Sequence, residues 1–325
     1  MPTKDNVLKY LKENNGFVSG EELSAKLGVS RTAIWKSIES LRNSGYKVDS
    51  VTNRGYRLVF SPDKYSEAEI SCGLNTEFIA KKIYCFESID STNSEAKRQA
   101  LRGAPNGSLF ISEQQTGGKG RLGHSFSSPY GVSLYFSILL RPEAAKINVE
   151  SLTLISGLAV FEAVREYTGL PAMIKWPNDV IVGTKKICGI LTEMSAEVER
   201  IEFLVVGIGV NVNNDGFENE LANKATSLYL ESGKKIRRIE LLQKILQKFE
   251  TLLKSTASGD MSFLGKYKKY CISLGRHVNF TRNNIKVSGT AVDISEKGEL
   301  LVKLESGETV PVYSGEVCVQ GIYGQ

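Results

Sequence analysis

The sequence predicts an α+β protein with three domains: a winged helix-turn-helix at the N-terminus, a central α/β domain and a small β-barrel at the C-terminus. Three observations predict this fold class. Residues 1–62 show helical patterning followed by two short strands, residues 80–270 alternate strands with helices, and about five short strands with turns follow Leu274. A chain of 325 residues has room for this division. We expect the domains to span residues 1–63, 64–271 and 272–325.

Two short helices in the first domain predict the helix-turn-helix. A Ser-x-x-Glu capping box starts a helix over residues 19–27. Ser30 can cap a second helix over residues 31–43, in which Ile34, Ile38 and Leu41 share one apolar face. The opposite face is expected to enter the major groove of DNA. Its outward residues are Arg31, Thr32, Trp35, Lys36 and Ser37, and the predicted DNA contacts are Ser30, Arg31, Thr32, Trp35 and Lys36.

Two strands between Tyr46 and Leu58, joined at residues 52–55, predict a wing that carries Arg54 and Arg57 as further DNA contacts. Residues 1–62 hold ten Lys or Arg and six Asp or Glu, so a charge of +4 out of the chain's net +5 lies there. Basic charge confined to one small domain indicates that this domain binds the phosphates of a nucleic acid. A winged helix used for protein contacts is the alternative, and the basic, polar face of the second helix argues against it.

Composition excludes several classes of protein. No stretch approaches the ~18 consecutive apolar residues of a membrane span, and the first residues lack an apolar signal region, so we expect a cytoplasmic protein without a membrane partner. The five cysteines are scattered without a Cys-x-x-Cys motif, and the chain has only two histidines. We therefore expect no structural metal.

Strands and helices alternate through the central block. Pro177 cannot donate to a sheet ladder, so Asn178 and Asp179 are expected at a strand end, lining a pocket. The dipeptide at residues 183–184 predicts a hairpin turn. The predicted strands are 83–87, 108–112, 131–140, 173–182, 187–194 and 202–213, and the predicted helices are 92–102, 149–168 and 236–258, after a helical connector at 64–79.

The most informative segment is residues 113–126, EQQTGGKGRLGHSF. Its glycines are expected to allow positive φ angles and close approach of the backbone to a ligand. Lys119 and Arg121 supply two cations, which suit phosphate oxygens or a carboxylate. The segment predicts an anion-binding loop that is mobile when empty and ordered when occupied. A flexible surface loop with incidental charges is the alternative.

Five motifs together resemble the biotin–protein ligases. They are DSTN at 90–93, GGKGRLG at 117–123, KWPND at 175–179, KICGIL at 186–191 and GIGVN at 207–211. They appear in the family's order and approximate spacing, and the resemblance covers nearly the whole chain. It implies a class II synthetase-like fold for the central domain and an SH3-like C-terminal barrel. With the N-terminal domain, it implies a ligase that is also a biotin-responsive transcriptional repressor.

The chemistry of such a ligase begins with activation of a carboxylate. ATP supplies AMP as the leaving group, which gives biotinoyl-5'-AMP, and biotin then passes to a lysine of the biotin carboxyl carrier protein of biotin-dependent carboxylases. Cations between the biotin carboxylate and the α-phosphate lower the barrier. By this resemblance Lys186 and Arg121 are the catalytic residues.

The resemblance also implies two groups of binding residues. The predicted biotin site consists of Ser91, Thr92, Asn93, Gln115, Lys119, Gly120, Arg121, Lys186 and Gly189. Residues expected near ATP and its Mg²⁺ are Lys175, Asn178, Asp179, Asn211 and Phe126.

The sequence departs from the family's usual pattern at Lys119, where arginine is common, and at Phe126, where tryptophan is frequent. Two other functions remain open: a lipoate–protein ligase and a non-enzymatic repressor that senses biotin. The KWPND motif and the N-terminal domain argue against the first, and the pair Lys186 and Arg121 argues against the second. The resemblance further implies a ligand-promoted homodimer on an operator with two half-sites.

Overall fold

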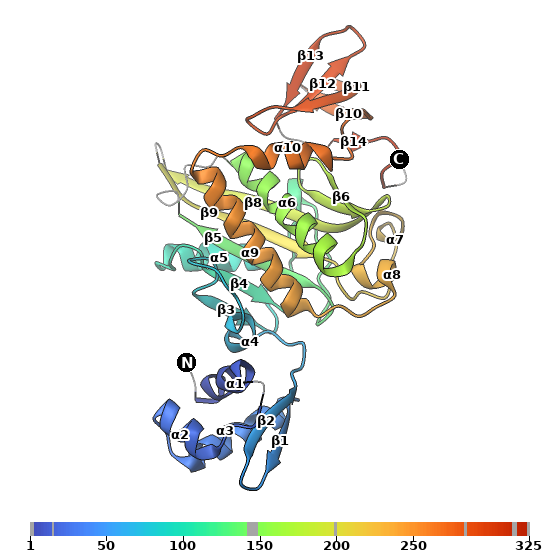
Figure 1. Cartoon of the computed structure of the whole chain (residues 1–325). Coiled ribbons are helices and arrows are strands. Elements are labelled where there is room, and N and C mark those ends of the chain that lie inside the picture. Colours follow the sequence, from blue (N-terminus) through green and yellow to red (C-terminus); the bar gives the residue numbers. More distant parts are fainter. Residues whose placement is uncertain are drawn as a thin grey trace. The chain divides into compact units, whose positions relative to one another are not determined.

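The computed structural model describes residues 3–14, 16–141, 149–197, 200–282, 285–313 and 317–323. The chain divides into two compact units, Met1–Leu74 and Asn75–Gln325 (Figure 1). The first unit contains α1 (Thr3–Glu13), α2 (Gly20–Leu27), α3 (Arg31–Asn43), β1 (Lys47–Val51), β2 (Gly55–Phe60) and α4 (Glu67–Ser71).

The predicted helix-turn-helix is confirmed in the first unit. The Ser19 hydroxyl accepts a hydrogen bond from the backbone N–H of Glu22 at 3.0 Å, and Ser30 caps α3 in the same way through Ala33 at 3.2 Å. Gly28 ends α2 with a φ of 66°, the left-handed conformation that favours glycine. Helix α1 was not predicted, although Val7, Leu8 and Leu11 share one buried face, a spacing that indicates an amphipathic helix.

The predicted helical connector over residues 64–79 is wrong: only Glu67–Ser71 is helical. This helix, α4, packs within the first unit, whereas the sequence placed the segment after residue 63 with the central domain. Ala68 joins the core of the first unit, and the fully buried carboxylate of Glu69 forms an ion pair with Lys12 of α1. A buried carboxylate requires such a partner, so α4 is tied to the first unit up to Leu74.

A seven-stranded sheet forms the centre of the second unit, in the order β3-β4-β5-β9-β8-β7-β6. Strands β3 and β4 are parallel and the other neighbours are antiparallel. The hairpin predicted at residues 183–184 joins β7 to β8. The strands are β3 (Ile83–Phe86), β4 (Leu109–Ser112), β5 (Leu134–Leu140), β6 (Ala172–Lys175), β7 (Asp179–Val182), β8 (Lys185–Glu197) and β9 (Arg200–Val210).

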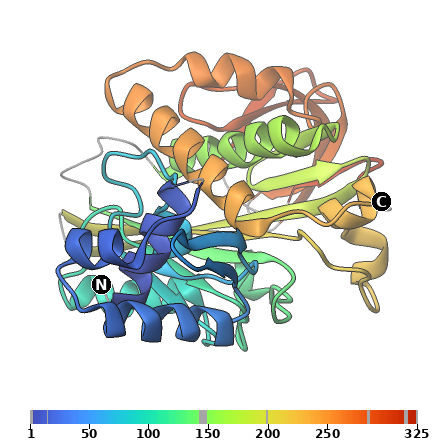
Figure 2. The ribbon, with the colours of Figure 1, turned by 60° about the horizontal axis from the view of Figure 1, so that its bottom comes forward.

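Helices cover both faces of this sheet. Helix α5 (Thr92–Leu101) packs on one face, and α6 (Val149–Thr168) and α9 (Arg238–Ala257) lie side by side on the other (Figure 2). The shorter helices are η1 (Arg121–Gly123), α7 (Leu221–Lys224), α8 (Leu228–Ser232) and α10 (Ser262–Lys269). None of the described helices combines the length and the apolar character that crossing a membrane requires.

The strand predicted over residues 173–182 is two strands, β6 and β7, separated by a turn at residues 176–178. The indole of Trp176 in this turn is buried, and its Nε1–H donates to the Gly298 carbonyl at 2.9 Å. This bond fastens the central sheet to the C-terminal strands. These strands form a five-stranded antiparallel sheet from β10 (His277–Arg282), β11 (Ile285–Ile294), β12 (Leu300–Leu304), β13 (Thr309–Val312) and β14 (Cys318–Val319).

Candidate functional site

One pocket in the second unit brings together the residues of separate motifs. It lies on the face of the sheet that α5 covers, and all nine residues predicted to bind biotin line it. Phe126 and Asn178, which were predicted near the nucleotide, line it as well. The lining residues are Ser91, Thr92, Asn93, Gln115, Lys119, Gly120, Arg121, Phe126, Asn178, Lys186, Gly189, Ile190, Leu191, Gly207, Ile208 and Gly209.

Glycines keep the floor of the pocket free of side chains. Gly189 of β8 lies directly opposite Gly209 of β9, and Gly207 lies opposite Leu191. A Cβ atom on Gly209 would meet the Phe126 ring at 2.5 Å, and one on Gly207 would meet the Asn93 side-chain oxygen at 2.1 Å. These positions therefore require glycine because of close approach by a neighbouring side chain.

We expect Gly207→Ala to raise the Kd for biotin by about tenfold or more, because the added methyl must displace Asn93 and overpacking costs about 1–3 kcal/mol. Isothermal titration calorimetry measures this change. The control is Gly216→Ala, since a Cβ at Gly216 meets no atom within 4 Å. Equal affinities for the two variants would contradict the requirement for a glycine at position 207.

A hydrogen-bonded network closes one end of the pocket. The Gln115 side-chain oxygen accepts from the Thr92 backbone N–H at 2.8 Å. The Asn93 amide donates to Glu193 at 2.8 Å and accepts from the Ser137 hydroxyl at 2.6 Å. Ser137 and Glu193 were not predicted as part of the site. They lie 44 and 100 residues from Asn93 along the chain, and no local motif marks them.

Helix α5 begins at this end of the pocket, and Ser91 is its N-cap residue. The neighbouring Asp90 carboxylate accepts hydrogen bonds from the Arg98 guanidinium at 2.8 and 2.9 Å. These bonds, together with one from the Ser91 backbone, outweigh desolvation and lower the pKa of Asp90 to about 2.

Because the pKa of Asp90 in the folded state lies below its unfolded value, its carboxylate stabilises the fold above the unfolded pKa, and this contribution is lost as the pH falls through about 2. We expect Asp90→Asn to reduce the free energy of unfolding at pH 7 by under about 1 kcal/mol. The difference from the unmodified protein should shrink as the pH falls from 3.8 towards about 2. Urea unfolding across this range tests it, with the exposed Glu87→Gln as the control. A difference that is constant with pH would contradict the prediction.

Three cationic side chains line the pocket, Lys119 beside the first turn of α5 and Arg121 and Lys186 near Asn178 and Asp179. The Arg121 guanidinium donates to the Asn178 side-chain oxygen at 2.9 Å, which holds the glycine loop against the turn after β6. Lys119 donates to the Ser94 hydroxyl at 3.0 Å. The Lys186 ammonium lies 2.6 Å from a carboxylate oxygen of Asp179, and its side chain is 30% exposed, so a ligand in the pocket can reach it.

Asp179 is buried behind Lys186 and organises the charges there. The Tyr323 hydroxyl donates to its second carboxylate oxygen at 2.7 Å. Burial alone would raise the pKa of Asp179, but Lys186, Lys175 and the hydrogen bonds together lower it. Lys175 is buried too, and burial lowers the pKa of its ammonium although Asp179 opposes the shift. The Lys175 ammonium donates to the Val317 carbonyl at 3.2 Å.

Three of the residues predicted near ATP do not line the pocket: Lys175, Asp179 and Asn211. The Asn211 amide donates to the Thr226 carbonyl at 3.1 Å, which fastens the end of β9 to the segment before α8. Within the described residues, no group of three His, Cys, Asp or Glu side chains is arranged to hold a metal ion.

The glycine loop corrects a further expectation. Of its four glycines only Gly123 has a positive φ, and Leu122 beside it has a φ of 54°. Gly118 is required for another reason, since a Cβ there would lie 2.4 Å from the Phe126 carbonyl oxygen. The loop therefore turns back on itself at close range, and its glycines mainly allow the two arms to touch.

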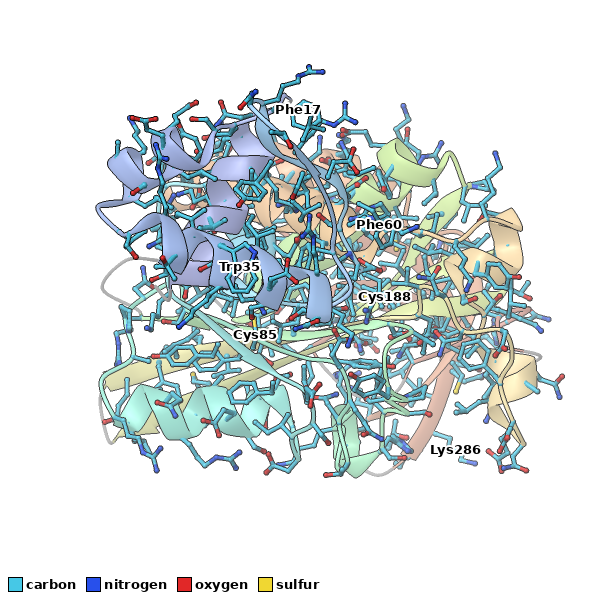
Figure 3. The ribbon with its side chains drawn as sticks, turned by 90° about the horizontal axis from the view of Figure 1, so that it is seen from below. Phe17, Trp35, Phe60, Cys85, Cys188 and Lys286 are labelled. Atoms are coloured by element: carbon cyan, nitrogen blue, oxygen red, sulfur yellow. The ribbon has the colours of Figure 1, made fainter. Side chains whose placement is uncertain are left out.

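The surface of the first unit that the sequence predicts to contact DNA carries Arg31, Thr32, Trp35 and Lys36, all exposed, together with the N-cap Ser30. Trp35 is 54% exposed on α3 (Figure 3). Ser37 was predicted to point outward, and this is wrong: it is buried, and its hydroxyl donates to the Ala33 carbonyl at 2.8 Å.

The wing residues Arg54 and Arg57 are both exposed and both lie over the Phe17 ring, at 4.4 and 4.7 Å from its centre. Arg57 also forms an ion pair with Asp49 at 2.8 Å. The ring thus groups two guanidinium groups beside the wing.

Three family models match the chain: an HTH domain over residues 3–57, the biotin/lipoate A/B protein ligase family over residues 85–211 and the biotin protein ligase C terminal domain over residues 273–319. The bifunctional ligase/repressor BirA of Bacillus spizizenii is 37% identical over 317 residues, which are 97% of this chain and 97% of that protein. BirA of Escherichia coli is 28% identical and covers 98% of both chains. A solved biotin protein ligase from Aquifex aeolicus, in complex with biotin and ATP, matches 74% of this chain and 99% of its own with a TM-score of 0.65 and 35% identity.

Proposed function

The chain belongs to the family of bifunctional biotin–protein ligases and repressors, and from this premise we propose that its second unit makes biotinoyl-5'-AMP from biotin and ATP and transfers biotin to a lysine of biotin carboxyl carrier protein. The first unit binds operator DNA and represses transcription. The observation that carries the ligase proposal is the pocket in which Lys186 and Arg121, from two different motifs, lie with Ser91, Thr92 and Gln115.

The two ends of the pocket suit the two ends of biotin. The ureido ring is neutral and needs hydrogen-bonding groups, which the network around Thr92, Asn93 and Gln115 supplies. The carboxylate needs cations, which Arg121 and Lys186 supply near Asn178 and Asp179, while Lys119 lies beside the first turn of α5. We propose this orientation for biotin, with the bare glycines of β8 and β9 under its apolar rings.

Lys186 would act where the biotin carboxylate attacks the α-phosphate of ATP. Both reactants are anions, so an ammonium between them offsets their repulsion and stabilises the charge that grows on the phosphoryl oxygens. Asp179 holds the Lys186 ammonium at 2.6 Å and so orients it before substrates arrive. Arg121 would hold the same phosphate and, through its bond to Asn178, keep the glycine loop over the intermediate.

Mg²⁺ accompanies ATP in this proposal but is not bound by Asp179. One oxygen of that carboxylate accepts from the Tyr323 hydroxyl, and the other, which has no hydrogen-bond partner among the described residues, lies 2.6 Å from the Lys186 ammonium, so a second cation there would meet a like charge. We therefore place the ion on the nucleotide phosphates. The class II synthetase-like fold, the SH3-like barrel and a cytoplasmic location are further parts of the proposal, and the five free cysteines suit a reducing compartment.

The experiment that tests the ligase proposal incubates the protein with ATP, Mg²⁺ and either biotin or lipoate. Mass spectrometry then detects the acyl-adenylate. We expect biotinoyl-AMP and no lipoyl-AMP. Lipoyl-AMP alone would make the protein a lipoate ligase, and binding of biotin without any adenylate would make it a sensor without enzymatic activity.

We propose in addition that biotinoyl-AMP promotes a homodimer that binds two half-sites. This ligand can contact the glycine loop through both its acyl and phosphate parts, and ordering the loop costs roughly 1–2 kcal/mol per residue without it. Two linked half-site contacts bind far more tightly than one. The intermediate would then act as the corepressor.

Sedimentation analysis measures this coupling. We expect a mainly monomeric protein without ligand, little change with biotin, and a dimer fraction several times larger with a non-hydrolysable adenylate analogue. Equal dimer fractions in the three samples would rule out the coupling and leave the ligase proposal intact.

A further inference from the structure

A second pocket in the second unit borders the first, and three residues, Arg121, Ile190 and Leu191, line both. The second pocket lies on the opposite face of the sheet, where α6 packs. Its lining includes Glu150 and Thr153 of α6, and the Thr153 hydroxyl lies 2.9 Å from that of Thr192 on β8.

The two pockets meet at a free edge of the sheet. Strand β7 pairs with β8 only as far as Asp179 opposite Gly189. After Ile190, which bonds to Asn178, the following residues of β8 pair with β9 alone among the described strands. Arg121 bonds to Asn178 at this edge and lines both pockets. The two pockets are therefore neighbours at the edge of β8.

The chemistry of the second pocket suits the side chain of a lysine. Trp176 and Pro177 form an apolar wall, and Tyr313, 63% exposed, stands at the rim. Such walls suit a stem of four methylene groups. The exposed carboxylate of Glu150 suits the ammonium at its end, and Glu150 forms no ion pair with another described residue.

We propose that this second pocket is the entry site for the acceptor lysine of the carrier protein, with Glu150 as the group that attracts its ammonium. The inference rests on the proposed ligase function. After the ammonium loses a proton to water, the neutral Nζ attacks the acyl carbon of biotinoyl-AMP at the Arg121 end of the first pocket. A C–N bond forms, the C–O bond to the phosphate breaks, AMP leaves with the bonding electron pair, and the new amide nitrogen gives its extra proton to water.

Charge argues against the other occupant that this position suggests, the pyrophosphate of ATP. Among the described residues that line the second pocket, Arg121 is the one cation, and Glu150 opposes its charge. A highly charged polyphosphate would meet a carboxylate there, whereas an ammonium is attracted by it. Glu150 would also hold the lysine in its protonated form, so its contribution is to binding rather than to proton removal.

The test uses the full chain with Glu150→Gln or Glu150→Lys and an unmodified biotin carboxyl carrier protein as the acceptor. The matched control is Glu296→Lys, an exposed carboxylate on the turn that holds Gly298 but outside the pocket. Formation of biotinoyl-AMP and its transfer to the carrier are measured separately. Hydroxylamine, a small amine that is neutral at pH 7, serves as a second acceptor.

We expect the KM for the carrier to rise about threefold with Glu150→Gln and about tenfold with Glu150→Lys, with kcat within about twofold of its original value. Adenylate formation and the reaction with hydroxylamine should be unchanged, which also shows that the variants fold. An unchanged KM would overturn the proposal, and altered adenylate formation by Glu150→Lys would assign the pocket to the nucleotide. Absence of biotinoyl-AMP from the unmodified protein would instead refute the ligase function itself.

Discussion

Replacing Lys186 by alanine is expected to slow the formation of biotinoyl-AMP by roughly 10²–10³-fold, the usual cost of removing one charge-stabilising donor. An ion pair with the buried carboxylate of Asp179 orients the Lys186 ammonium. Its loss leaves the biotin carboxylate and the α-phosphate without a fixed cation between them. Single-turnover assays of adenylate formation measure the change.

The control for this variant is Lys185→Ala, because the neighbouring lysine donates to the Ala222 carbonyl and does not line the pocket. Lys186→Ala also leaves Asp179 without its ion-pair partner, which can destabilise the fold. The double variant Lys186→Ala, Asp179→Asn removes that charge as well. A folded sample of either variant with normal single-turnover rates would refute the assignment of Lys186.

Removal of residues 1–74 is expected to abolish specific operator binding, a loss of about 10³-fold or more in affinity, and to preserve adenylate formation. The cut falls after Leu74 because α4 packs within the first unit through Ala68 and Glu69. Gel-shift assays and adenylate assays on the same preparation measure the two activities. Loss of adenylate formation would show that the two functions are not modular.

A point variant in the full chain tests the same surface without truncation. Lys36→Glu changes a charge on the exposed face of α3, and Lys64→Glu makes the same change in the connector after β2. We expect only Lys36→Glu to weaken DNA binding strongly and to reduce its salt dependence by about one phosphate contact. Equal effects of the two variants would indicate a general effect of charge.

Local patterns predicted the parts of the fold that local interactions decide. Ser19 and Ser30 correctly predicted the starts of the two helices of the helix-turn-helix, because each serine caps its helix through a residue only three positions later. The turn residues at 183–184 correctly predicted the hairpin of β7 and β8, because a hairpin turn is also decided by neighbouring residues. Ser37 was misplaced because its polarity indicated the surface, while its hydroxyl is satisfied by a carbonyl of its own helix.

Contacts between distant segments were beyond the reach of such patterns. The ion pair between Glu69 and Lys12 and the packing of Ala68 tie α4 to the first unit, and both depend on residues that are distant along the chain. Sequence motifs predicted that Asn93, Arg121 and Lys186 belong to one site. They did not indicate which side chains position these three residues. Their supports, Glu193, Asn178 and Asp179, become visible only when the strands are placed side by side.

The hydrogen bond from Tyr323 to Asp179 has a consequence for how the enzyme becomes active during its synthesis. The two residues lie 144 positions apart, and the Val317 carbonyl that receives Lys175 is equally late in the chain. A ribosome that has released only the central sheet therefore presents the ion pair of Lys186 and Asp179 without the hydrogen bonds that Tyr323 and Val317 supply. The hydrogen bonds around Asp179 and Lys175 are therefore complete only after the residues at 317 and 323 have emerged and docked, so the surroundings of the pocket are among the last parts of the fold to form.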